Sequence, residues 1–218
     1  MKIPLKYRNK PAILIATGPS LTEEVVETIR PYKNDFIIFG CNDSYRLVDY
    51  LDLHYACDKA WWDLHATSFR EKYPDLEAWT QAEDYKNSEF NLNVVQGKHA
   101  RSLSTDSSLI HWGSNSGYQL LNIAFLMGCS KFLVVGYNMQ KIGGVRHFFG
   151  EHPDGLSKNS PYHKFLSAFD SIEEPIRNIV VNCTPDSALT TFRNGNLQEE
   201  LESASIKSFC SKNTCIIC

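Results

Sequence analysis

The chain has 218 residues, of which 43% are hydrophobic and 22% charged, and its formal net charge is -3. This composition is typical of an ordinary globular domain with a buried core, and it argues against a protein whose whole surface binds a polyanion. The chain contains no apolar run of about 18 residues, and its N-terminus lacks the features of a signal peptide. We therefore expect a soluble, cytoplasmic protein without a transmembrane segment.

The seven cysteines show no zinc-type pairing among the first four, which favours reduced thiols. Cys215-Ile216-Ile217-Cys218 has the outline of a prenylation motif, but a terminal Cys is atypical there and no polybasic segment precedes it. We interpret residues 201–218 as a C-terminal tail and residues 1–200 as one domain.

Short apolar runs that end in turn residues predict five buried strands, at Pro11–Ala16, Phe36–Cys41, Leu53–Cys57, Phe132–Gly136 and Ile179–Cys183. The predicted helices begin after the capping-box pattern Ser20 to Glu23, around Ser44–Tyr50, at Ser116–Met127 and at Pro161–Asp170. Residues 63–112 are expected to be an irregular insertion with one weak strand at Asn91–Val95. Alternation of strands and helices predicts an α/β fold, with a Rossmann-like, open, mostly parallel sheet and helices on both faces.

The turn after the first strand, Thr17-Gly18-Pro19-Ser20, is a candidate nucleotide-binding loop. Gly18 would allow close approach of the backbone to a ligand, and Ser20 with the first helical N–H groups could receive a phosphate or a ribose hydroxyl. The same residues also suit a plain strand-to-helix turn with a capping serine. The turn has neither the G-x-G-x-x-G fingerprint nor the lysine of a P-loop, so ordinary dinucleotide or P-loop binding is not supported.

Polar residues also follow other predicted strands, namely Asn42, Asp58 and the pair Tyr137-Asn138. Ligands of open parallel sheets bind beyond the carboxyl ends of the strands, so we expect these residues near the binding site. Gly113-Ser114-Asn115-Ser116-Gly117 opens the long apolar helix at the same edge. This segment is either an anion-binding nest or a helix cap with permissive glycines.

Two histidines, His147 and His152, lie in a long loop beyond the fourth predicted core strand. A neutral imidazole can accept a proton from an attacking hydroxyl near pH 7, so both are candidates for a general base. A surface histidine pair and a metal site are the alternatives. No third ligand stands at conventional spacing and Asp-x-Asp is absent, which favours a mechanism without a metal. Asp58, Trp61 and Trp62 could form an acceptor or donor pocket, or the tryptophans could be core residues.

The order of these motifs resembles the bacterial sialyltransferases that decorate lipooligosaccharide, nearly from end to end. Ile15–Leu21 matches the family's Gly-Asn-Gly-Pro-Ser-Leu turn, Gly40–Asn42 matches its Arg-Cys-Asn, and Asn115–Gly117 matches its Thr-Ser-Gly. Further along, His147–His152 resembles the family's His-Tyr-Ile-Gly-His, and Cys183–Phe192 resembles its Cys-Pro-Asn-Ser-Leu-Leu-Ala-Asn-Phe. Thr17 stands in place of the asparagine of the first turn, and Asn115 in place of the threonine.

The resemblance implies a metal-independent, inverting glycosyltransferase that uses a nucleotide-activated sugar, with a CMP-sugar as one candidate donor. It implies that His152, or else His147, is the general base. It also implies that the donor nucleotide is bound by Thr17, Gly18, Pro19, Ser20, Asn42, Asn115, Ser116, Gly117, Tyr137 and Asn138.

Two other functions stay open. The Gly-Pro-Ser-Leu start is also similar to that of pterin pyrophosphokinase-like proteins, which would transfer diphosphate from ATP and would require magnesium. The third alternative is a non-catalytic nucleotide-binding module. For the transferase we expect no cofactor besides the nucleotide-sugar. Its acceptor would be a glycan or another hydroxyl-bearing molecule, with a modified nucleic acid not excluded, and assembly into a homo-oligomer is left open.

Overall fold

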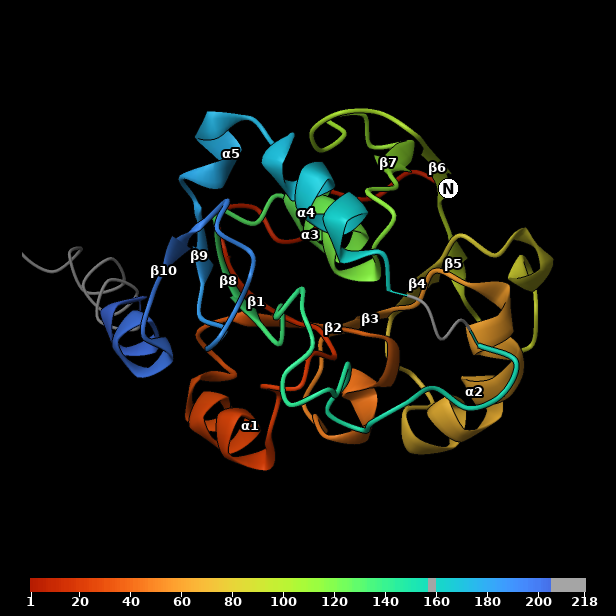
Figure 1. Ribbon diagram of the computed structural model, residues 1–218. Helices are drawn as coiled ribbons and strands as arrows, with labels where there is room; N and C mark the ends of the chain where they lie inside the picture. Colours follow the sequence, from red (N-terminus) through yellow and green to blue (C-terminus); the bar gives the residue numbers. More distant parts are fainter. Residues whose placement is uncertain (157–159, 205–218) are drawn as a thin grey trace, which may run out of the picture.

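The computed structural model describes residues 1–156 and 160–204, which form a single α/β domain around an eight-stranded parallel sheet (Figure 1). The strand order is β10-β9-β8-β1-β2-β3-β4-β5. These strands are β1 (Pro11–Ile15), β2 (Ile37–Cys41), β3 (Leu53–Tyr55), β4 (Ala78–Thr80), β5 (Asn93–Val94), β8 (Lys131–Val135), β9 (Val180–Asn182) and β10 (Arg193–Asn194). A separate parallel pair consists of β6 (Gln96–Lys98) and β7 (Leu109–His111). The predicted Rossmann-like fold class is confirmed.

Helices cover both faces of the sheet, with α3 and α4 on one side and α1 and α2 on the other (Figure 1). The helices are α1 (Glu23–Ile29), α2 (Lys59–Lys72), α3 (Ser116–Leu126), α4 (Tyr162–Asp170) and α5 (Glu174–Arg177). Short 3-10 turns lie at Arg30–Tyr32, Asn42–Arg46 and Glu83–Tyr85.

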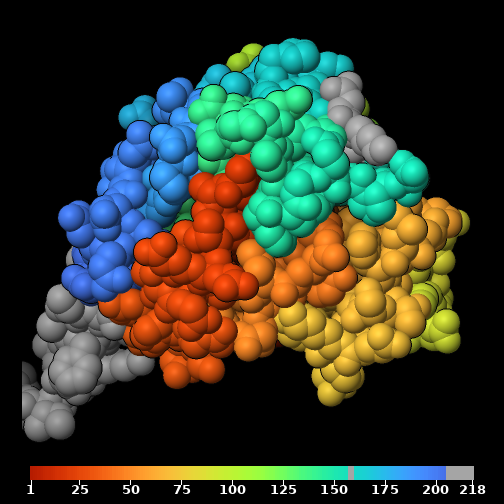
Figure 2. Space-filling model, turned by 60° about the horizontal axis from the view of Figure 1, so that its bottom comes forward, coloured from red at the N-terminus to blue at the C-terminus, as the bar shows by residue number. Residues whose placement is uncertain are grey.

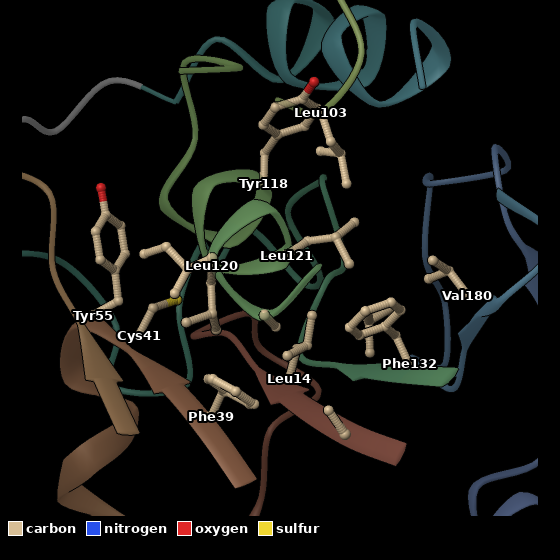
Figure 3. Close-up of a cluster of buried hydrophobic side chains, with 14 of the residues drawn as sticks. Leu14, Phe39, Cys41, Tyr55, Leu103, Tyr118, Leu120, Leu121, Phe132 and Val180 are labelled. Atoms are coloured by element: carbon tan, nitrogen blue, oxygen red, sulfur yellow. The ribbon is translucent and has the colours of Figure 1, made fainter. Parts of the chain in front are cut away.

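Successive side chains of β1 enter two different cores, because neighbouring residues of a strand point to opposite faces. Leu14 packs with Phe39, Leu120 and Leu121 under α3 (Figure 3). Ile13 belongs to the core that α1 and α2 cover on the other face. Burial on both faces explains why the central strands are continuous apolar runs in the sequence.

The direction in which strands are added reverses at β1. From β1 the chain moves outward through β2, β3, β4 and β5, then returns through α3 to β8 on the opposite side of β1. The loops that follow β1 and β8 therefore diverge, which opens a crevice at the carboxyl ends of the strands. This is the place where open α/β sheets bind ligands.

The predicted capping box at the start of α1 is wrong. The cap is Thr22, whose hydroxyl accepts a hydrogen bond from the N–H of Val25 at 3.3 Å. The preceding residues form a turn closed by a 3.0 Å bond from the Leu21 N–H to the Gly18 carbonyl. The Ser20 hydroxyl bonds to Asn138, so it is not available to cap the helix.

The segment predicted to be irregular contains regular structure. Helix α2 begins before it, at Lys59, and continues for 14 residues. Strands β4 and β5 extend the main sheet beyond β3, and β5 lies within the weak strand predicted at Asn91–Val95. The buried residues of α2 are mostly aromatic rather than aliphatic, so the helix depends on the core beneath it more than on a strong apolar pattern of its own.

At the C-terminal end, residues 197–204 are helical and Leu201 is fully buried, although 201–204 belong to the segment interpreted as a tail. The prenylation-like motif Cys215–Cys218 lies outside the described residues. Cys41, Cys57, Cys129 and Cys183 are free thiols, as predicted. Among residues 1–156 and 160–204, no helix is both long and apolar enough to cross a membrane.

Candidate functional site

A pocket of about 300 Å³ lies at the carboxyl ends of β1, β2 and β8, in the crevice beside β1. Its other sides are the start of α3, the start of α4 and the loop after β8. Figure 2 shows this loop, in teal, lying on the surface against the red N-terminal part of the chain and the orange segment that follows β2. A hydrogen bond of 3.1 Å from the Phe148 N–H to the Thr17 carbonyl joins the loop to the turn after β1.

Most residues that the sequence singles out line this pocket. They are Thr17, Gly18, Asn42, Asp58, Asn115, Ser116, Gly117, Asn138, His147 and His152. Pro19, Ser20, Tyr137, Trp61 and Trp62 are not among the lining residues. Ser114 of the predicted nest also lines the pocket, and pocket residues that the sequence analysis missed include Cys41, Met139, Gln140, Arg146 and Tyr162.

Gly18 and Ser20 connect the turn after β1 to the end of β8. A Cβ on Gly18 would lie 2.3 Å from Asn138 Oδ1 and 2.4 Å from the Gly136 carbonyl oxygen. Asn138 Oδ1 accepts hydrogen bonds from the Ser20 N–H at 3.1 Å and from its hydroxyl at 2.7 Å. The Asn138 amide donates to the Pro185 carbonyl at 3.0 Å. Gly18 therefore allows the turn after β1 to approach the end of β8, rather than a ligand, and the Ser20 hydroxyl is already hydrogen-bonded within the protein.

The start of α3 offers backbone donors to the pocket. The Asn115 side chain caps the helix by accepting from the Tyr118 N–H at 3.0 Å. The N–H groups of Ser116 and Gly117 have no backbone partner among the described residues. Free N–H groups at a helix N-terminus bind anions, and the helix dipole adds to the attraction. Ser116 and Gly117 can therefore contact a negatively charged group.

Tyr137 supports this helix start from below. It is fully buried, and its hydroxyl donates to the Gly117 carbonyl at 3.0 Å. Burial raises the pKa of Tyr137 well above its ordinary value, so the hydroxyl stays protonated. A Cβ on Gly117 would lie only 2.8 Å from the Tyr137 ring, which explains the glycine at this position.

His147 and His152 lie side by side at the pocket, with ring centroids 4.5 Å apart. A tight turn brings them together: the Gly150 N–H donates to the His147 carbonyl at 2.9 Å, and Gly150 adopts a φ of +90° that favours glycine. The Phe149 ring stacks on His147 at 5.0 Å. Thr17 Oγ1 lies 3.1 Å from His147 Nδ1 and fixes the other side of that ring.

Both imidazoles are neutral near pH 7. Burial, followed by the charge that His152 would carry, lowers the pKa of His147 to about 4. Burial also lowers the pKa of His152, whereas the carboxylate of Asp43 raises it. His147 Nε2 and His152 Nδ1 are buried without a hydrogen-bond partner among the described residues. Burial therefore keeps both rings in the neutral form that can accept a proton.

Asp43 is the buried carboxylate behind the two histidines. It is 1% exposed, and its oxygens bond to Trp61 Nε1 at 3.0 Å and to Arg46 at 3.3 Å. Trp61 and Trp62 thus belong to the core under α2, and the Trp62 indole donates to the Ala56 carbonyl at 3.0 Å. The core alternative for the two tryptophans is the one observed.

Arg146 is the cationic side chain of the pocket. Its Nε donates to Glu151 Oε1 at 3.2 Å, and a second guanidinium nitrogen contacts the other oxygen of Glu151. This ion pair spans the turn that carries the histidines. In the sequence, the feature that could have pointed to Arg146 is its position directly before the candidate base His147. Among residues 1–156 and 160–204, no three His, Cys, Asp or Glu side chains are grouped so that they could hold a metal ion.

Comparison with known proteins identifies a solved structure with a similar fold. No protein-family model matches the chain, and no curated protein matches it. Among solved structures, it is similar to the MAf glycosyltransferase from Magnetospirillum magneticum AMB-1, with a TM-score of 0.62 and 13% sequence identity. The match covers 97% of this chain but only 38% of that protein. At this identity the likeness establishes the shared fold.

Proposed function

We propose that this protein is a glycosyltransferase that moves a sugar from a nucleotide-activated donor to an acceptor hydroxyl. The observation that carries the proposal is the pair of neutral histidines at a polar pocket beside the switch point of the sheet. A nucleotide at this place is typical of doubly wound folds. The fold likeness to a glycosyltransferase and the motif order shared with the sialyltransferases support the same class.

The donor phosphate would lie against the start of α3. The N–H groups of Ser116 and Gly117 can bind its oxygens, and the Arg146 guanidinium lines the same pocket. The amide of Asn42 lines the pocket as well and is suited to the nucleoside. We propose that these groups stabilise the leaving phosphate without a metal ion. A CMP-sugar is the donor that the motif order favours.

His152 would act as the general base. Its ring lines the pocket, the Asp43 carboxylate favours its protonated form, and burial keeps it neutral before the reaction. The acceptor oxygen forms a bond to the anomeric carbon while the bond from that carbon to the phosphate breaks. The hydroxyl proton passes to His152, and the electron pair leaves with the nucleotide. An attack opposite the leaving phosphate inverts the anomeric configuration.

Calorimetry with CMP, UMP, GMP, UDP and ATP tests the proposal. We expect saturable binding of CMP in the presence of a chelator. The variant Ser116→Pro should bind CMP more weakly, because it lacks a backbone N–H donor at the start of α3. Because Pro is tolerated at the first helical position, this variant should still fold. If none of the five nucleotides binds, the proposal fails. If ATP alone binds, and only with magnesium, diphosphate transfer is the better explanation.

A further inference from the structure

A second cavity of about 280 Å³ adjoins the pocket just described. The two share Asp58, Ser114, Asn115 and Ser116 as lining residues. On its far side the second cavity is lined by Gln81, His99 and Trp112, which come from the β4 end and from the segments around β6 and β7. A molecule in this cavity would therefore lie directly beside a donor bound in the first pocket.

Trp112 is the aromatic residue of this cavity. It is partly exposed, whereas Trp61, Trp62 and Trp79 are at most 3% exposed. Gly97 of β6 makes room for its indole, because a Cβ there would lie 2.0 Å from Trp112 Nε1. The ring of His99 packs edge-on against the indole, with centroids 4.4 Å apart. The position of the Trp112 ring is thus fixed by its surroundings.

The remaining groups of the cavity are hydrogen-bonding side chains. Gln81 Nε2 is buried without a partner among the described residues. Asp58 is exposed, has no side-chain bond at the helix start that it precedes, and lines both cavities. A flat aromatic ring beside amide and carboxylate groups matches a sugar, which has an apolar C–H face and a rim of hydroxyls.

We propose that this cavity is the acceptor subsite and that its ligand is a saccharide, an inference that rests on the proposed transferase function. The C–H face of the sugar would pack on Trp112, and Gln81 would bind one of its hydroxyls. Asp58, at the junction, would bind a hydroxyl next to the one that His152 deprotonates. The cavity is at the small end of ligand sites, which suits the terminal sugar residue of a glycan.

Tryptophan emission provides the test, since Trp112 is the partly exposed indole of the chain. Lactose, N-acetylglucosamine and methyl β-galactoside are titrated into the full chain saturated with CMP. We expect a saturable change in emission with at least one saccharide. Trp112→Phe should abolish the change while calorimetry still gives the wild-type Kd for CMP.

Gln81→Ala keeps the Trp112 emission signal and should raise the Kd of the saccharide about three- to tenfold, the usual effect of one lost hydrogen bond. Gln198→Ala is the matched control, because Gln198 lies on the C-terminal helix and lines neither cavity. Binding of CMP with no emission change for any saccharide would overturn the subsite but not the transferase. Equal saccharide affinity in Gln81→Ala would overturn it as well. Failure of every nucleotide to bind would instead refute the function on which the inference rests.

Discussion

Replacing Asn138 with alanine should destabilise the protein substantially, because Asn138 joins three loops at the carboxyl edge of the sheet. The side chain is 1% exposed and makes two bonds to Ser20 and one to the Pro185 carbonyl. With about 1 kcal/mol for each bond, Asn138→Ala should lower the free energy of unfolding by about 3 kcal/mol. For a domain of this size, that corresponds to a fall in Tm of about 6–12 °C.

Urea unfolding followed by tryptophan emission measures the effect, with an unchanged m-value as evidence that the two states stay comparable. Ser20→Ala is the graded control, since it removes only the hydroxyl bond and should cost about 1 kcal/mol. The reasoning is refuted if Asn138→Ala unfolds at the wild-type urea concentration. It is also refuted if the two variants are equally destabilised, because then the bonds to the Ser20 N–H and to Pro185 contribute nothing.

Four further outcomes are expected. His152→Gln should lower kcat about 10²–10⁴-fold in a transfer assay with little change in the Kd of CMP, and wild-type turnover in this variant would exclude His152 as the base. The acid limb of the wild-type kcat/KM profile should lie below pH 6.5, since burial lowers the pKa of His152 and only the neutral ring accepts a proton. Asp43→Asn should move that limb to still lower pH, because the carboxylate raises the pKa of His152 and of His147; an upward shift would contradict this. Gly18→Ala should cost about 1–3 kcal/mol in urea unfolding, since its Cβ would overlap the Gly136 carbonyl, and full stability would show that the strand ends can separate freely.

The central strands could be predicted from the sequence because both of their faces are buried. β1, β2 and β8 are each continuous apolar runs, and the turn residues that follow them are Gly or polar. β4, with three residues, carries too little pattern to identify a strand, whereas β5 lies within the weak strand predicted at Asn91–Val95. The place of β4 in the sheet is determined by pairing with β3, and that of β5 by pairing with β4, which are tertiary effects.

The sequence predicted the location of the residues at the strand ends better than it predicted their roles. Asn42, Asn115 and Asn138 all line the pocket, as the parallel-sheet rule requires. The rule says nothing about which polar group is already bonded within the protein. Ser20 and Tyr137 follow strands too, but their hydroxyls bond to Asn138 and to the Gly117 carbonyl.

The second cavity had no signal along the sequence. Gln81, His99 and Trp112 belong to separate segments of the region that looked irregular, and none stands in a recognisable motif. They meet because β6 and β7 pair next to the main sheet and because Gly97 leaves space for the indole. Long-range packing of this kind cannot be predicted from local patterns.

Thr17 connects the turn after β1 to the histidine loop, and it is also a position at which the chain differs from the sialyltransferase motif that it resembles. The residue lies where that family has an asparagine, which could bind a ligand with both ends of its amide. Here the shorter side chain places its hydroxyl 3.1 Å from His147 Nδ1, and the backbone carbonyl of the same residue accepts from the Phe148 N–H. Two bonds thus fix the loop relative to the turn, so that the position of the proposed base depends on β1. Burial lowers the pKa of the His147 ring held in this way to about 4, so a neutral imidazole lies 4.5 Å from the ring of His152, the base that we propose.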